Sequence, residues 1–258
     1  MGKPMSKTIA IANQKGGVGK TNITFNLSGA LAQKNKKILL IDLDQQGNLS
    51  SAFLDNIYNL PLTVADILLE NDTPVSKIIN KTSFENIDII PSNIDLSKID
   101  LQLAGEPDAQ YFLADKLKDI KDNYDYILID CPPSLGLPTR IGLVASDEVI
   151  IPLECQEWAV KGTAYLRDAI TKIKKRANPK LKIMGYLISK LDSRRKLEEV
   201  YHDTILESFK DKVFKVSLKN SVKYTEAATF KKPITLYLPS SEQAKVYHKL
   251  AQEIINHG

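Results

Sequence analysis

A glycine-rich loop between an apolar run and a helical pattern constrains this chain more than any other feature. The apolar run covers residues 8–12 and is typical of a buried strand. After the loop, Ile23, Phe25, Leu27 and Leu31 predict an amphipathic helix. The loop itself consists of Lys15, Gly16, Gly17, Val18, Gly19, Lys20 and Thr21.

Strand, glycine loop and helix in this order form the context of a phosphate-binding loop. Glycines let backbone N–H groups turn inward around phosphate oxygens without a Cβ atom in the way. The helix N-terminus adds partial positive charge. Lys20 can then reach the β and γ phosphates, and the Thr21 hydroxyl can bind Mg²⁺. The loop therefore predicts nucleotide binding.

The loop departs from the general pattern at its start. The pattern places glycine five residues before Gly19, where this chain has Gln14. A second lysine, Lys15, follows directly. Because Lys20 already serves the phosphates, Lys15 is either a solvated surface residue or a cation with a separate task.

Length and composition are typical of one globular α/β domain. The chain has 258 residues, 43% of them hydrophobic and 26% charged, which is enough for one sizeable core. No apolar run approaches the roughly 20 residues of a membrane span, and no apolar signal region is present. Cys131 and Cys155 have no metal-type spacing and form no disulfide framework. We therefore expect a cytoplasmic protein with a single domain at residues 1–258.

The net charge of +4 is unevenly distributed. Residues 161–232 contain 19 Lys and Arg but 8 Asp and Glu, a balance of +11, so the rest of the chain carries −7. Such asymmetry favours a polyanion-facing surface in the C-terminal half. The alternative is a set of solvated helix faces, and charge alone does not decide between the two.

Near-continuous apolar runs alternate with helical patterns along the chain, as in a parallel sheet buried on both faces. Further strands are expected at residues 38–41, 87–90, 126–129, 149–151, 183–188 and 213–216. Helices are expected at residues 109–120, 161–177, 197–209 and 240–255, and another from a start at residues 63–66. This alternation predicts an α/β fold, a doubly wound and mostly parallel sheet with helices on both faces. Its ligands would bind at the carboxyl ends of the strands.

Acidic residues close two of the predicted strands. Asp130 ends the strand at 126–129, where a nucleotide-hydrolysing enzyme places a carboxylate that holds Mg²⁺ through water. Asp42 and Asp44 follow the strand at 38–41, and their side chains point to opposite sides of an extended chain. Asp44 is the better candidate to orient the attacking water or a water on Mg²⁺. Asp42 is then structural.

Three motifs in this order resemble the ParA/Soj family of partitioning ATPases, which lies in the same superfamily as MinD. They are the deviant Walker A loop at residues 15–21, the Asp-Leu-Asp-Gln-Gln-Gly-Asn segment at 42–48 and the Ile-Asp-Cys-Pro-Pro-Ser-Leu-Gly segment at 129–136. The resemblance covers nearly the whole chain. It is to the short class, which lacks an N-terminal helix-turn-helix.

The resemblance implies a slow ATPase that needs ATP and Mg²⁺ and forms a homodimer with ATP. Lys15 resembles the signature lysine that crosses the dimer interface to the partner subunit's ATP. Lys20 resembles the phosphate lysine and Thr21 the direct Mg²⁺ ligand. Asp44 resembles the residue whose loss blocks hydrolysis, and it would join Asp130 on Mg²⁺ through water. The implied nucleotide site consists of Lys15, Gly16, Gly17, Val18, Gly19, Lys20, Thr21 and Asn22.

The same resemblance implies non-specific binding of double-stranded DNA by the ATP dimer, on the nucleoid. It also implies a ParB-like centromere-binding partner that stimulates hydrolysis, in chromosome or plasmid partitioning. Arg194, with Arg195 beside it, lies in a segment that resembles one carrying a DNA-binding arginine. Lys223 stands in place of a second such arginine, and Lys219 lies close by in the sequence. The basic balance of residues 161–232 favours the same region.

A few residues depart from the family pattern. Gln45 stands where the family usually has proline, and Asn22 replaces a second threonine. Glu154-Cys155-Gln156 resembles the family's Gln-Cys-Glu with its ends exchanged. These departures bear on hydrolysis rate and partner response rather than on ATP binding.

Three alternative functions stay open. A MinD-like membrane ATPase would need a basic amphipathic anchor at its C-terminus, but residues 240–258 carry few cations, and we expect them to pack on the core. An iron–sulfur carrier is disfavoured because the two cysteines form no Cys-x-x-Cys. A non-catalytic scaffold would follow if Gln45 marked lost hydrolysis.

Overall fold

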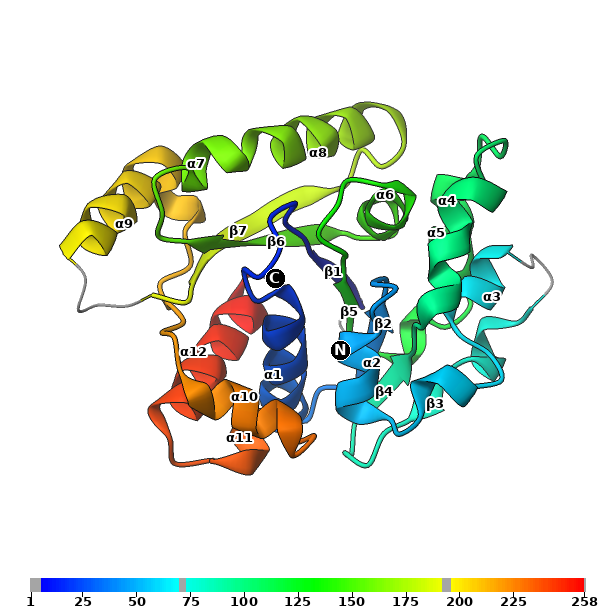
Figure 1. The fold of residues 1–258 in the computed structure, drawn as a ribbon, viewed down its shortest axis with the longest axis horizontal. Coiled ribbons are helices and arrows are strands. Elements are labelled where there is room, and N and C mark those ends of the chain that lie inside the picture. The colour runs from blue at the N-terminus through cyan, green and yellow to red at the C-terminus, as the bar shows by residue number, and fades with distance from the viewer. Residues whose placement is uncertain (1–5, 70–72, 192–195, 258) are drawn as a thin grey trace, which may run out of the picture.

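The computed structural model describes residues 6–69, 73–191 and 196–257. Within them a seven-stranded sheet has the order β3-β4-β2-β5-β1-β6-β7, and every strand pair is parallel except β3 with β4 (Figure 1). The strands are β1 Lys7–Ile11, β2 Ile38–Asp42, β3 Asn80–Lys81, β4 Ile87–Ile90, β5 Tyr126–Asp130, β6 Glu148–Glu154 and β7 Lys182–Ser189. The predicted fold class is confirmed.

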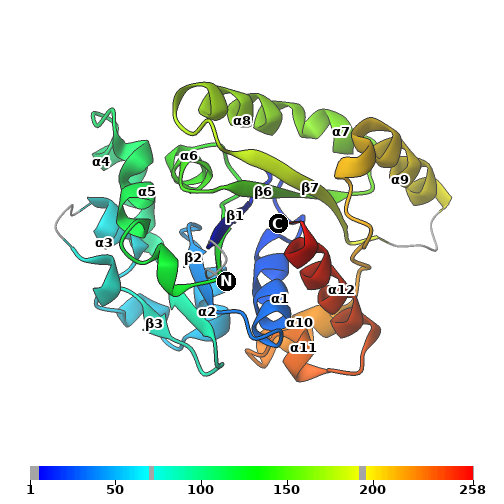
Figure 2. The ribbon, with the colours of Figure 1, turned by 180° about the vertical axis from the view of Figure 1, so that it is seen from behind.

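Helices cover both faces of this sheet. In Figures 1 and 2, α1, α10, α11 and α12 lie on one side, and α6, α7 and α8 lie on the other. The α-helices are α1 Lys20–Ala32, α2 Asn48–Phe53, α3 Val64–Leu69, α4 Ile99–Gln102, α5 Phe112–Leu117, α6 Leu137–Val144, α7 Ala159–Gly162, α8 Ala164–Arg176, α9 Lys196–Phe209, α10 Val222–Thr229, α11 Ile234–Tyr237 and α12 Glu242–Asn256.

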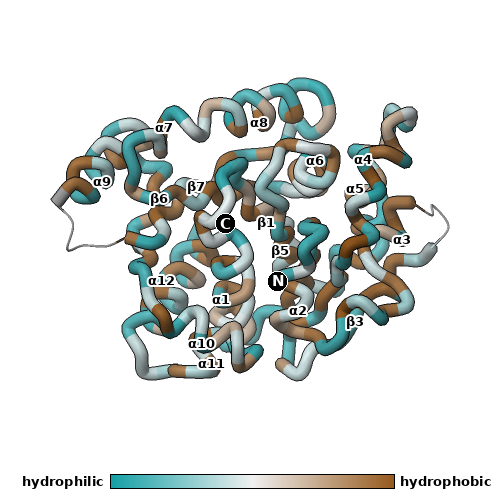
Figure 3. The backbone as a smooth tube through the Cα atoms, in the orientation of Figure 1, coloured by the Kyte–Doolittle hydropathy of each residue, from teal (hydrophilic) through white to brown (hydrophobic). Residues whose placement is uncertain are grey.

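The apolar strands feed two separate cores. Side chains alternate across a strand, so Ala10 of β1 packs in one core while its neighbours Ile9 and Ile11 pack in the other. Surface helices carry a single apolar face, as Leu166, Ile170 and Ile173 do on α8. The alternation of brown and teal along these helices in Figure 3 shows the same pattern. Burial on both faces explains why the strands are nearly continuous apolar runs.

The C-terminal helix packs on the core, as the sequence predicts. Its buried residues are Ala244, Tyr247, Leu250, Ala251 and Ile254. They belong to the core that also contains Ile23 and Leu27 of α1. In the described parts of the chain, no helix combines the length and the apolar character that crossing a bilayer requires.

Four local predictions were wrong in detail. α1 is not amphipathic, because the sheet and α12 enclose it and even Thr24, Asn26 and Ser28 are buried. The expected strand at 213–216 makes only an isolated bridge to β7, in which Phe214 N donates to Tyr186 O, while Lys215 N donates to Glu253 Oε1 of α12. The helices expected at 109–120 and 161–177 are each broken into two shorter helices, and β3 was not expected.

Gly29 marks the tightest packing of α1, so we predict that Gly29→Ala overpacks it. A Cβ atom there would meet the Pro233 ring and lie 3.0 Å from Thr235 Oγ1. The free energy of unfolding should fall by about 1–3 kcal/mol in urea titrations. Gly105→Ala is the matched control, because nothing lies within 4 Å of its added Cβ. Equal stability of the two variants would contradict the packing.

Candidate nucleotide-binding site

The glycine loop runs from the end of β1 to the start of α1. Gly17 and Gly19 have φ angles of 78° and 88°, the left-handed region that residues with a Cβ rarely adopt. The start of the loop is clamped to β6, because Asn13 Nδ2 donates to Pro152 O at 2.6 Å. Its Oδ1 accepts from Lys15 N at 2.9 Å. These contacts fix a loop whose glycines lead into the N-terminus of α1.

Lys20 is the first residue of α1, and it is buried, with 7% of its surface exposed. Its Nζ lies 3.3 Å from Lys15 O across the loop. Burial lowers the pKa of Lys20, and the carboxylates of Asp130 and Asp44 oppose that shift. A buried cation beneath a glycine loop favours a bound anion, because the anion supplies the counter-charge that water does not.

Asp130, the last residue of β5, lies directly beneath the helix start. It is fully buried, and Oδ2 accepts a 2.6 Å hydrogen bond from Thr21 Oγ1. Burial and the neighbouring Asp42 raise its pKa, against the favourable effects of Thr21 and Lys20. Among the described residues, Oδ1 has no hydrogen-bond partner. An unpaired carboxylate oxygen in a buried position is costly unless a cation or water meets it.

The two acids after β2 have different surroundings. Asp42 is fully buried, and its carboxylate accepts from Ser50 Oγ at 2.7 Å, Ser50 N at 2.9 Å and Asp44 N at 3.0 Å. Burial raises its pKa to about 6, although these bonds oppose the shift. Asp44 is less enclosed, and in the described residues its carboxylate accepts one hydrogen bond, at 3.0 Å from Gln46 N to Oδ1. Ser50, which holds Asp42 in place, carries no signal that sequence reasoning could use.

The side chains around Thr21 and Asp130 suit Mg²⁺. The unpaired Asp130 Oδ1 and the Thr21 hydroxyl are oxygen donors, the type that Mg²⁺ prefers. No cage of three or more acidic, histidine or cysteine side chains is found in residues 6–69, 73–191 and 196–257. A site with few protein ligands fits this ion, because Mg²⁺ keeps several waters and takes further ligands from phosphates.

Comparison with known proteins places this geometry in a family. A family model described as an AAA domain matches residues 6–183. The chain is 41% identical over 254 residues to the sporulation initiation inhibitor protein Soj of Bacillus subtilis, an alignment that covers 98% of this chain and 100% of that protein. The chain belongs to the ParA/Soj family.

Solved structures support the ParA/Soj assignment. A cobyrinic acid a,c-diamide synthase from Mycobacterium smegmatis, with bound ATP analogue and magnesium, superposes with a TM-score of 0.87 at 29% identity, covering 98% of this chain and 95% of that one. The cell division ATPase MinD of Pyrococcus furiosus superposes with a TM-score of 0.80 at 26% identity, covering 98% and 100%. The ParA/Soj fold therefore extends over nearly the whole chain.

The residues expected to contact DNA in a ParA/Soj protein are only partly described. Lys219 and Lys223 are both exposed, and Lys223 lies in the first turn of α10. Leu191 forms a parallel bridge with Lys219. Arg194 and Arg195 follow Leu191 in the sequence. Those two arginines lie outside the described residues. The structure therefore describes two of the four residues, Lys219 and Lys223, and places both at the surface.

Different surroundings predict different consequences for the two acids after β2. Asp42→Ala leaves the backbone donors of Ser50 and Asp44 without their acceptor, which should lower the free energy of unfolding by about 2–3 kcal/mol. Asp44→Ala removes one bond at a more open position, and the loss should stay below about 1 kcal/mol. Urea unfolding of both nucleotide-free variants tests this. An unstable Asp44→Ala beside a stable Asp42→Ala would reverse the assignment.

Proposed function

We propose that this protein is a Mg²⁺-dependent ATPase that dimerises with ATP, binds DNA non-specifically and drives chromosome or plasmid partitioning. One observation carries the proposal. The Thr21 hydroxyl bonds to one oxygen of the buried Asp130 carboxylate, whose other oxygen is unpaired in the described residues. Both lie beneath a loop whose glycines have positive φ angles, in a chain 41% identical to Soj. A ParB-like partner would stimulate its turnover.

The phosphate end of the site divides its tasks among four side chains. Lys20 would neutralise the β and γ phosphates, and Thr21 would hold Mg²⁺ directly. Asp130 and Asp44 would hold it through water, and Asp44, the more open of the two, would also orient the attacking water. Magnesium, when bound, neutralises charge on the phosphate oxygens. The ATP analogue and magnesium named for the Mycobacterium smegmatis structure support this choice of nucleotide and ion.

Lys15 has a different task from Lys20. Its side chain is 49% exposed, whereas Lys20 is buried. A long cation at the rim of the site can reach a phosphate on a second subunit, which would make the dimer depend on ATP. Each subunit of a two-fold dimer would contribute its lysine to the other's nucleotide.

The DNA-binding face is proposed on the basic C-terminal half. Lys219 and Lys223 are exposed cations there, and Lys219 forms a bridge with Leu191, which lies three residues before Arg194 in the sequence. Lysine neutralises phosphate without reading bases, so binding would be insensitive to sequence. An ATP dimer presents two such faces to one duplex, which would couple DNA binding to nucleotide. Such a dimer would associate with the nucleoid.

Replacing the two lysines of the loop should separate binding from assembly. Lys20→Ala should weaken ATP binding at least about a hundredfold, because two charge-assisted phosphate contacts are lost. Lys15→Ala should bind ATP within about threefold of the parent protein, yet fail to dimerise or hydrolyse it. Calorimetric titration gives the affinities, and sedimentation velocity with ATP and Mg²⁺ gives the assembly state. A Lys15→Ala protein that still dimerises with ATP would contradict the cross-subunit role.

Charge reversal on the proposed DNA face should weaken DNA binding and leave ATP binding intact. Lys219→Glu with Lys223→Glu removes four phosphate contacts per dimer, so the slope of log affinity against log salt should flatten by about four units. Fluorescence anisotropy with two unrelated duplexes across a salt series measures it. Lys77→Glu with Lys118→Glu is the matched control, since both are exposed lysines outside the basic segment. If the control variant weakens DNA binding as much as Lys219→Glu with Lys223→Glu does, the effect comes from net charge and not from this face.

A further inference from the structure

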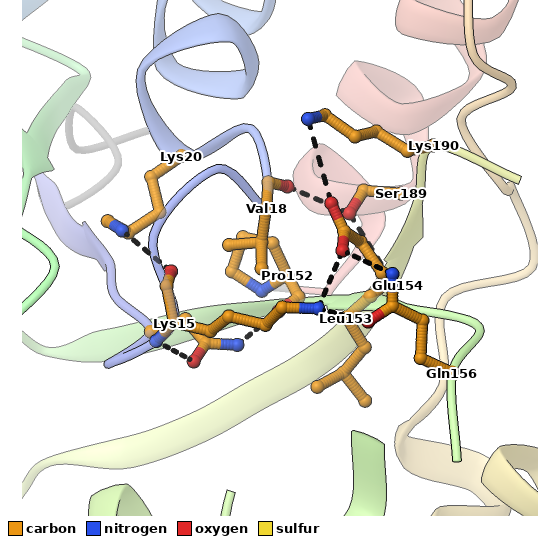
Figure 4. Close-up of polar contacts among 10 residues, drawn as sticks. Lys15, Val18, Lys20, Pro152, Leu153, Glu154, Gln156, Ser189 and Lys190 are labelled. Atoms are coloured by element: carbon orange, nitrogen blue, oxygen red, sulfur yellow. Dashed lines mark hydrogen bonds and ion pairs between the residues drawn. The ribbon is translucent and has the colours of Figure 1, made fainter. Parts of the chain in front are cut away.

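Glu154 ends strand β6 at the rim of the site, where its carboxylate is mostly enclosed (Figure 4). Only 13% of the side chain is exposed. In the parallel register of β6 and β7, its partner residue is Ser189. A carboxylate with so little access to water needs cations or hydrogen-bond donors from the protein.

Two lysines from different segments meet this carboxylate. Lys15 Nζ lies 2.7 Å from Oε2, and Lys190 Nζ lies 3.6 Å from Oε1. The Gln156 amide joins them, because its Nε2 donates to Glu154 Oε2 at 3.0 Å and its Oε1 accepts from Lys15 Nζ. In Figure 4 the Lys15 side chain extends along the loop toward Glu154 and away from Lys20.

The backbone around this cluster is fixed. Ser189 Oγ lies 2.8 Å from Val18 O of the loop and 3.2 Å from Leu153 O of β6. Asn13 ties the start of the loop to Pro152. Because the loop and both strands are held together, the contact between Lys15 and Glu154 can change by movement of side chains without movement of the backbone.

We infer that Glu154 is a positioning residue that retains Lys15 on its own subunit until an ATP-bearing partner replaces the carboxylate with phosphate. The inference rests on the proposed cross-subunit role of Lys15. The dimer would then form by exchange of one ion pair for another, and nucleotide would favour it because phosphate replaces the carboxylate. Lys190 stays with Glu154 after the exchange, so the enclosed carboxylate is never left without a cation.

The exchange occurs twice in a symmetric dimer, which enlarges its effect. A partly exposed ion pair of this kind changes an equilibrium by a factor of about two to five. Two pairs broken together change the dimer dissociation constant by the square of that factor, about fourfold to twenty-fivefold. A neutral residue at position 154 should therefore strengthen the ATP dimer by roughly tenfold.

The direct test compares Glu154→Gln with the parent in sedimentation equilibrium, using a non-hydrolysable ATP analogue and Mg²⁺. The dimer dissociation constant should fall by roughly tenfold, and the monomer's affinity for the analogue should stay within about twofold. Glu148→Gln is the matched control, because Glu148 lies at the other end of β6, is also 13% exposed and pairs with Lys7 at 3.0 Å. The control should leave the dimer unchanged, and thermal unfolding shows that each variant is folded.

Lys190 gives a second, coupled measurement. Lys190→Gln should weaken the dimer, since Glu154 would then lose both of the lysines that meet it in the described residues when Lys15 leaves. The same substitution should have no effect in a Glu154→Gln background. A general attraction between Lys190 and the partner's phosphates would instead weaken the dimer equally in both backgrounds, and that result would overturn the inference.

Failure of the inference differs from failure of the proposed function. If Lys15→Ala loses the ATP dimer but Glu154→Gln dimerises no more tightly than the parent, Glu154 does not hold the lysine and the cross-subunit role stands. If Lys15→Ala dimerises like the parent, the cross-subunit role itself is wrong and the inference falls with it. A tighter Glu154→Gln dimer, unmatched by Glu148→Gln, supports both.

Discussion

The parallel register of β1, β2 and β5 brings two buried carboxylates side by side, and the rest of the candidate site depends on that contact. Asp42 and Asp130 are register partners at the ends of their strands, and Ile11 pairs with Asp130 from the other side. Burial and mutual repulsion raise the pKa of Asp130. Hydrogen bonds offset part of this cost, because Ser50 donates to the Asp42 carboxylate and Thr21 donates to one oxygen of Asp130.

The repulsion between these carboxylates is least compensated at Asp130, which lies at the proposed phosphate site. Asp42 has three donors around it and behaves as a structural residue that shapes the turn before α2. Asp130 keeps an unpaired oxygen beneath the start of α1. A hydrated divalent cation would relieve the repulsion and fill the missing bond at once. The same electrostatics explains why Lys20, whose pKa burial lowers, is held near Asp130.

Sequence patterns predicted the parts of this fold that depend on neighbouring residues. The loop, the strand that precedes it and the acids at strand ends are local signals, and the structure contains each where it was expected. Features that depend on distant segments were missed. α1 is enclosed because α12, more than 200 residues away, covers it. The apolar residues 213–216 make a single bridge to β7, through Phe214 N and Tyr186 O, and Lys215 N bonds to the distant Glu253 of α12. Ser50 gains its importance only when the fold places it under Asp42.

The exchange of Glu and Gln at positions 154 and 156 is another feature whose role depends on a distant segment and could not be predicted from the sequence. The sequence displays the departure, but its meaning depends on a contact between residues 139 positions apart, Lys15 and Glu154. The loop carries two lysines, Lys15 and Lys20, and their different surroundings suit them to different tasks. Lys20 is enclosed beneath the loop, whereas Lys15 rests on a carboxylate that also has Lys190 and Gln156 beside it. A cation with a replaceable partner suits the proposed transfer between subunits, and a buried one does not.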